Sequence, residues 1–184
     1  MNETERSWRF ETLALPHLDS AYNLARWLLK NDPEAEDAVQ QAFLRAFRYF
    51  DGFAGDDARA WILTIVRRSC YDLMRTRKTR QAVLDPLDEV DERDFERRED
   101  GPPDPETALL RRRDGELINT LIAALPEEFR EILVLREIED LSYRQIATVV
   151  GVPLGTVMSR LARARALLRR AYLREQPKEA VDGL

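Results

Sequence analysis

The sequence predicts an all-α protein of two small helical domains joined by a flexible acidic linker, the second domain containing a helix-turn-helix. Three observations predict this. Apolar residues recur at helical rather than alternating spacing. A strongly acidic stretch with a Gly-Pro-Pro run has too few apolar residues to offset its ordering entropy. A short capped helix, a glycine and a basic helix follow it. We expect domains at residues 1–80 and 107–176, the linker at 81–106, and a short tail at 177–184.

The composition excludes several classes of protein. Of the 184 residues, 34% are charged and 44% are hydrophobic. No run reaches the roughly 18 apolar residues that a membrane span needs, and the charged start does not resemble a signal peptide. Cys70 is the single cysteine and His17 the single histidine, so neither an internal disulfide nor a thiolate–imidazole metal site can form. We expect a cytoplasmic protein with no membrane insertion, metal or cofactor.

The net charge of −5 conceals a strong internal asymmetry. Residues 67–80 are predominantly basic, and residues 157–174 contain arginines and no acid. The acids concentrate between these segments, at residues 81–105. The overall charge therefore says little about either domain, and the basic helices are typical of segments that approach nucleic acid.

The first domain should begin with a helix from Trp8 to about Lys30. A second helix follows, with Asp32 as its expected N-cap and Pro33 at its first position. One side of this second helix forms a continuous apolar stripe: Ala35, Ala38, Val39, Ala42, Phe43, Ala46, Phe47 and Phe50. This stripe should pack in the core of the domain.

The opposite side of that helix carries Asp37, Gln40, Gln41, Leu44 and Arg48. A single exposed leucine is ordinary on a protein surface. Here an acid and two glutamines flank it, and they could orient a partner helix by hydrogen bonds. These residues alone are equally compatible with a solvated face.

A third helix is expected over residues 58–78, after the glycine-containing loop at 51–57. Its core side should hold Ile62, Val66, Cys70, Leu73 and Met74, and its outer side Trp61, Thr64, Arg68, Tyr71 and Arg75. Aromatic rings alternating with arginines suit single-stranded nucleic acid, because bases stack on rings while guanidinium groups hold phosphates. The alternative is that Trp61 and Tyr71 pack on the first helix and the arginines are solvated.

The second domain contains the helix-turn-helix. Ser142 and Gln145 form a capping box, Gly151 can adopt the left-handed conformation that ends the short helix, and Pro153 starts the next one. In the second helix, Leu154 and Val157 should point inward. The reading positions toward base edges in the major groove should be Thr156, Ser159 and Arg163, and the flanking contacts to phosphates should come from Arg160, Tyr143 and Arg144. Arg163 can hold a guanine with two hydrogen bonds.

Three blocks of sequence resemble the bacterial RNA polymerase sigma factors of the extracytoplasmic-function type, a compact two-domain branch of the sigma-70 family. "DPEAEDAVQQAFLRAF" is similar to the family's polymerase-binding helix, and "FAGDDARAWILTIVRRSCYDLMR" to the helix and loop that melt and read the −10 element. "LPEEFREILVLREIEDLSYRQIATVVGVPLGTVMSRLARAR" is similar to the domain that reads the −35 element. The resemblance covers about residues 8 to 174 and preserves the order and spacing of the blocks.

The resemblance implies a role for each face. It implies core RNA polymerase (β′ and β subunits) as the partner, with the clamp helices of β′ meeting the polymerase-binding residues Asp37, Gln40, Gln41, Leu44 and Arg48. It implies contacts with the single-stranded −10 element through Phe53, Trp61, Arg67, Arg68, Tyr71 and Arg75, with a base flipped into a pocket beside the 51–57 loop. It implies contacts with the −35 duplex through Tyr143, Arg144, Thr156, Met158, Ser159, Arg160 and Arg163.

The implied function is that of a promoter-specificity subunit, which is not an enzyme and which an anti-sigma factor holds inactive. Three residues depart from the family pattern: Arg68 stands in place of a common asparagine, Met158 in place of a basic residue, and Gln41 in place of a glutamate. The alternative function is a self-sufficient helix-turn-helix regulator. Such a regulator generally needs a dimer, and it leaves the Leu44 face and the aromatic-basic helix without a purpose.

Overall fold

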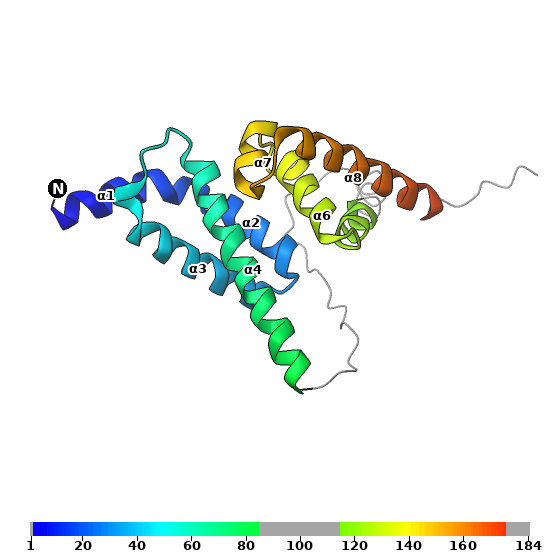
Figure 1. The fold of residues 1–184 in the computed structure, drawn as a ribbon, viewed down its shortest axis with the longest axis horizontal. Coiled ribbons are helices and arrows are strands. Elements are labelled where there is room, and N and C mark those ends of the chain that lie inside the picture. The colour runs from blue at the N-terminus through cyan, green and yellow to red at the C-terminus, as the bar shows by residue number, and fades with distance from the viewer. Residues whose placement is uncertain (1, 85–114, 176–184) are drawn as a thin grey trace, which may run out of the picture.

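The computed structural model describes residues 2–84 and 115–175, which form two packed groups of helices (Figure 1). The first group comprises α1 (Glu3–Ala14), η1 (Leu15–His17), α2 (Leu18–Leu29), α3 (Asp32–Arg48), η2 (Phe50–Gly52) and α4 (Ala58–Leu84). The second comprises a helical segment at residues 115–123, then α6 (Glu127–Leu133), η3 (Val134–Ile138), α7 (Tyr143–Val150) and α8 (Leu154–Glu175). The expected all-α fold is confirmed.

The first predicted helix is interrupted, and the prediction of one continuous helix from Trp8 to Lys30 was wrong. A 3₁₀ turn that contains Pro16 separates α1 from α2. Proline lacks the backbone N–H that a continuing α-helix needs and its ring obstructs the preceding turn, so the α-helix is interrupted there. Lys30 then ends α2 in the left-handed conformation, with φ of 55°.

The helix α3 begins one residue earlier than expected, because Asn31 rather than Asp32 is its N-cap. The Asn31 side chain accepts a hydrogen bond from the Glu34 backbone N–H at 2.9 Å. The apolar stripe of α3 faces the core as predicted, with Phe43 and Phe47 only partly buried. Phe47 packs edge to face on Phe10 of α1, with 5.2 Å between the ring centroids.

The helix α4 continues to Leu84, past residue 80, where the linker was expected to begin. The rest of the acidic segment, including the expected start of the second domain at residue 107, lies outside the described residues. As predicted, Ile62, Val66 and Cys70 are buried, whereas Leu73 and Met74 are only partly so.

The helix-turn-helix is confirmed in its local chemistry. Ser142 and Gln145 exchange both hydrogen bonds of the capping box. Gly151 ends α7 with φ of 74°, a conformation that residues with a Cβ rarely adopt. The two helices meet at a bend of 100°. No single helix in the described part of the chain is long and apolar enough to span a membrane; α7 and α8 meet that criterion only when the two are taken together across their bend.

The two groups of helices pack directly against each other, a feature that the sequence did not predict. The helix α4 contacts α7, and α2 contacts α6 (Figure 1). Leu63 of α4 and Leu135 of η3 are both fully inaccessible to solvent. The second domain therefore covers one side of α4, and this decides which of the expected binding residues are exposed.

Candidate nucleic-acid and polymerase interfaces

One candidate interface is the outer face of α3, where all five expected polymerase-binding residues are exposed. Leu44 is the one apolar residue among these five, and 70% of its surface is accessible. Around it lie the polar side chains of Asp37, Gln40 and Gln41. Tyr49, which directly follows Arg48, is 65% exposed and adds an aromatic surface that the sequence reasoning missed. An exposed leucine within a polar rim suits a protein partner.

A second candidate interface is a cavity at the end of α3, beside the loop before α4. Phe53 stacks on Trp61 with 4.5 Å between ring centroids and an interplanar angle of 29°. The cavity measures about 410 Å³ and is lined by Arg9, Leu13, Phe50, Asp51, Phe53, Ala54 and Gly55. Arg9 and Leu13 come from α1, so the sequence pattern of the loop could not reveal them. An aromatic wall and a cationic side chain make this cavity suitable for an unstacked base.

The loop that forms this cavity is fixed by two contacts. Arg6 of α1 donates hydrogen bonds to the Asp51 carboxylate at 3.0 Å and to the Phe47 carbonyl at 2.7 Å. Gly55 lies so close to Phe53 that a Cβ at this position would stand 3.2 Å from the ring. The glycine therefore lets the loop fold tightly over the aromatic stack.

The expected −10 face of α4 is divided into an exposed and a covered part. Arg68 and Arg75 are exposed, as predicted. Arg67 and Tyr71 instead face the second domain, where both donate hydrogen bonds to the carboxylate of Glu131. The expectation of one continuous free face was therefore wrong for this conformation. The alternative expectation, in which Tyr71 packs on the first helix, does not match the structure either, because Tyr71 bonds to Glu131 of the second domain.

Glu131 and the titratable groups around it are largely removed from solvent. Glu131 is 1% exposed, and this burial raises its pKa, although the hydrogen bond and charge of Arg67 act in the opposite direction. Burial also acts to lower the pKa of Arg67, but the hydrogen bond and charge of Glu131 outweigh it and the net shift is upward. Burial first and the Glu131 charge second raise the pKa of Cys70 to about 12, so its thiol stays protonated.

The third candidate interface is the N-terminal half of α8. Ser159, Met158 and Arg163 are exposed, and Thr156 is partly buried. Arg160 already has a partner, because its guanidinium group lies 3.3 Å from the Glu128 carboxylate of α6. Arg163 has no ion pair within the described residues and remains available for a ligand.

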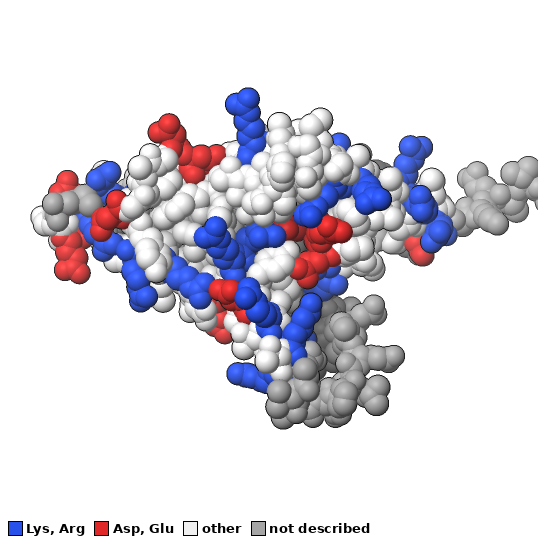
Figure 2. All heavy atoms as spheres, in the orientation of Figure 1, with Lys and Arg blue, Asp and Glu red and all other residues white. Residues whose placement is uncertain are grey.

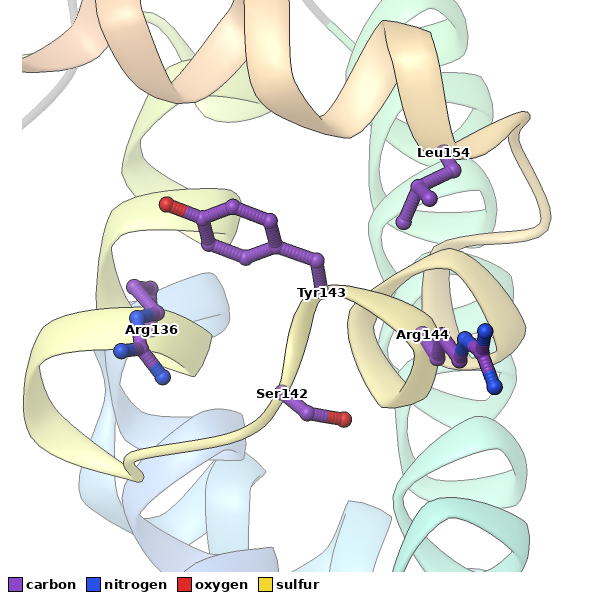
Figure 3. A pocket seen from close by; sticks show the side chains of 5 residues that line it. All are labelled: Arg136, Ser142, Tyr143, Arg144 and Leu154. Carbon is purple, nitrogen blue, oxygen red and sulfur yellow. The ribbon is translucent and has the colours of Figure 1, made fainter.

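A cavity of about 430 Å³ lies at the start of α7, lined by Arg136, Ser142, Tyr143, Arg144 and Leu154. Figure 3 shows Arg136 and the Tyr143 ring on one side of the helix start and Arg144 on the other. Arg136 was missed in the sequence; it donates to the Leu141 carbonyl at 2.8 Å and lies over the Tyr143 ring at 5.5 Å. Leu154 is 42% exposed, so the expectation that it points inward was wrong.

Basic side chains lie on two of the helices that carry these interfaces. Figure 2 shows basic side chains along α4 and α8, with a group of acidic side chains between α4 and α6. In the part of the chain that the structure describes, no group of three or more His, Cys, Asp or Glu side chains could hold a metal ion.

Comparisons with known proteins identify the family. The model of sigma-70 region 2 matches residues 13–80, and that of sigma-70 region 4 matches residues 115–168. The RNA polymerase sigma-H factor of Pseudomonas aeruginosa is 34% identical over 166 residues, covering 88% of this chain and 85% of its own. The chain belongs to the sigma-70 family. Its relatives place this sigma factor in the extracytoplasmic-function (ECF) branch: the ECF sigma-E factor of Escherichia coli is 33% identical over 138 residues, covering 72% of this chain and 70% of its own. The ECF sigma factor SigE of Mycolicibacterium smegmatis is 35% identical over 177 residues, covering 96% of this chain.

The sigma factor spans 65% of the length of the Mycolicibacterium relative. Among solved structures, the Bartonella quintana sigma factor RpoE, in complex with the anti-sigma factor NepR, matches with a TM-score of 0.76 and 25% identity. That match covers 91% of this chain and 99% of the other. CnrH in complex with the cytosolic domain of CnrY shares the fold, with a TM-score of 0.60 at 24% identity over 90% of this chain and 88% of the other.

Proposed function

We propose that this sigma factor is a promoter-specificity subunit that binds core RNA polymerase, recognises the −35 and −10 elements and promotes DNA melting. One observation carries the proposal. The segments that match sigma-70 regions 2 and 4 place an aromatic stack beside an open cavity on one domain and an exposed helix-turn-helix on the other. A chain with both surfaces can hold a separated strand and a duplex at once.

The polymerase contact is assigned to the exposed face of α3. Leu44 would enter an apolar site on a clamp helix of the β′ subunit, while the neighbouring amides and Asp37 make hydrogen bonds at the rim. The contact needs no rearrangement of this domain, because the five side chains already point into solvent.

Melting is assigned to the cavity beside Phe53. A base that leaves the duplex would stack against the Phe53–Trp61 pair, an interaction worth about 1–3 kcal/mol per base. The exposed guanidinium groups of Arg68 and Arg75 would hold the phosphates of the same strand. Trapping an unpaired base in this way needs binding energy and no catalytic residue.

Recognition of the −35 element is assigned to α8. Ser159 and Arg163 would approach base edges in the major groove. Arg144, which is exposed at the start of α7, would contact the phosphates. We also infer an anti-sigma partner, since the matched structures of RpoE and CnrH are complexes with NepR and with the cytosolic domain of CnrY.

Permanganate footprinting of unpaired thymines tests the melting step, with core RNA polymerase and a promoter that the sigma factor supports. Phe53→Ala should reduce thymine reactivity around −10 while leaving polymerase binding intact, because the stacking wall is lost. Trp8→Ala is the matched control, since Trp8 is 66% exposed on the same domain and does not line the cavity. Unchanged reactivity in Phe53→Ala would contradict the assignment. Tight, specific duplex binding by the chain alone would favour the self-sufficient regulator.

A further inference from the structure

Two ion pairs, one after the other along α4, join the two domains. Arg59 Nη2 of α4 lies 3.0 Å from Glu139 Oε2, and Arg67 Nε of α4 lies 2.5 Å from Glu131 Oε1. The order reverses along the second domain, so α4 runs antiparallel to the segment from α6 to the end of η3. We call Arg59 and Arg67 the basic pair, and Glu131 and Glu139 the acidic pair.

The contact between the pairs is specific rather than incidental. Glu139 is 6% exposed, and it also accepts hydrogen bonds from Asn23 of α2 at 3.1 Å and from Arg59 through its backbone carbonyl at 2.7 Å. Beyond Arg59, Gln145 of the capping box donates to Asp57 at 2.9 Å. Buried charges that are paired and also hydrogen-bonded define one relative arrangement of the domains.

Glu131 of the acidic pair occupies the part of the expected −10 surface that Arg67 and Tyr71 form. Glu131 accepts from Arg67 through two nitrogens, at 2.5 and 3.2 Å, in the forked geometry that an arginine also uses for a phosphate. Tyr71 donates to the same carboxylate at 3.3 Å, so its hydroxyl is engaged too, and the residue is partly buried. The faces around Leu44 and Arg163 remain exposed in the same arrangement.

We propose that the Arg67–Tyr71 surface of α4 has two alternating occupants, the Glu131 carboxylate in the closed chain and the phosphate backbone of single-stranded promoter DNA in the opened chain. This inference rests on the proposed function. The closed chain can meet polymerase through a fully exposed α3 face, whereas the surface for the separated strand lacks Arg67 and Tyr71 until the chain opens. The second domain is therefore an internal competitor of the −10 strand.

The physical basis is the balance within a buried ion pair. Desolvation of Glu131 and Arg67 opposes the closed state, and their mutual attraction supports it, so the net contribution is small while both charges are present. If one charge is removed, the other stays buried without a partner, and this shifts the equilibrium toward the open form, in which water can rehydrate it. The apparent affinity for a ligand of the open form then rises in proportion to the open fraction.

The closed arrangement is tested on the full-length chain without polymerase or DNA. Nitroxide labels at Gln40→Cys and Ala166→Cys, both exposed positions, report the interdomain distance by pulsed electron paramagnetic resonance. Cys70 can be left in place because it is fully buried. The wild-type background should give one narrow distance distribution, and Glu131→Arg a broader, longer one. A matched control is Glu137→Arg, because Glu137 pairs with Arg165 inside the second domain.

The charge exchange Arg67→Glu with Glu131→Arg should restore the narrow distribution, because the ion pair is rebuilt with its direction reversed. This double variant separates loss of pairing from loss of folding, which circular dichroism checks for each variant. A broad distribution in the wild type, or an exchange variant as open as Glu131→Arg although folded, would overturn the closed arrangement.

The competition is tested by fluorescence anisotropy with a labelled single-stranded oligonucleotide carrying the −10 sequence. Glu131→Gln should bind on the order of tenfold more tightly than the wild type, because a larger fraction of the chain is open. Glu36→Gln removes the same charge from the exposed surface of α3 and should leave the affinity nearly unchanged.

Equal affinities of Glu131→Gln and the wild type, with the domains shown to open, would overturn the competition. A failure of the proposed function would appear in a different experiment. In that case the wild type would give no transcript with core polymerase, whatever interdomain distance is measured.

Discussion

Leu44→Ala tests the polymerase-binding face most simply. Leu44 is 70% exposed in the free chain, so that fraction of its surface can still be removed from water by a partner. Full burial of a leucine side chain contributes about 1.5–3 kcal/mol, and 70% of that range is about 1–2 kcal/mol. Since 1.4 kcal/mol corresponds to a factor of ten, affinity for core RNA polymerase should fall on the order of tenfold.

The assay is equilibrium binding of fluorescently labelled sigma factor to core RNA polymerase, paired with thermal unfolding of each variant. Leu173→Ala is the matched control, because Leu173 is 61% exposed and lies at the far end of α8. Both variants should unfold near the wild-type temperature, since neither leucine is part of the core. If Leu44→Ala binds polymerase as tightly as the wild type, or if Leu173→Ala weakens binding equally, the assignment of the α3 face is refuted.

The remaining predictions concern the helix-turn-helix. Arg163→Ala should weaken binding of the holoenzyme to the −35 element by about 1–3 kcal/mol and relax base choice at one position. Arg160→Ala should have a smaller effect, because the Arg160 guanidinium already pairs with an acid of α6. Both effects are measured as binding of the holoenzyme to −35 promoter variants. Met158→Arg should strengthen −35 binding and steepen its salt dependence by about one phosphate contact, measured as a slope against salt concentration. Gly151→Ala should lower the free energy of unfolding by about 1 kcal/mol because of its positive φ, whereas Gly155→Ala, in the helix α8, should not; denaturant unfolding compares the two.

Much of the local structure could be predicted because it depends on neighbouring residues. The capping box at Ser142, the left-handed Gly151 and the apolar stripe of α3 each follow from residues within a few positions of one another. Pro16 does signal the break, but the apolar spacing continues across it and favours one uninterrupted helix. The cap at Asn31 was misplaced by one residue, since Asn and Asp are almost equivalent in this role.

The division of the −10 face could not be predicted, since it depends on contacts between distant residues. Arg67 and Glu131 are far apart in the sequence, and no periodicity relates α4 to α6. On helical spacing alone, Tyr71 belongs to an outer face, and its contact with Glu131 appears only when the second domain is in place. Likewise, Arg9 reaches the base-sized cavity from α1, an element that carries no motif.

In vitro transcription tests the central claim most directly. Purified core RNA polymerase is incubated with a pool of promoters, with and without the full-length sigma factor, and the start sites of the new transcripts are sequenced. We predict new transcripts that share a −35 and a −10 element and that require the sigma factor. Transcripts that are identical with and without it, from polymerase that is active with another sigma factor, would contradict the claim.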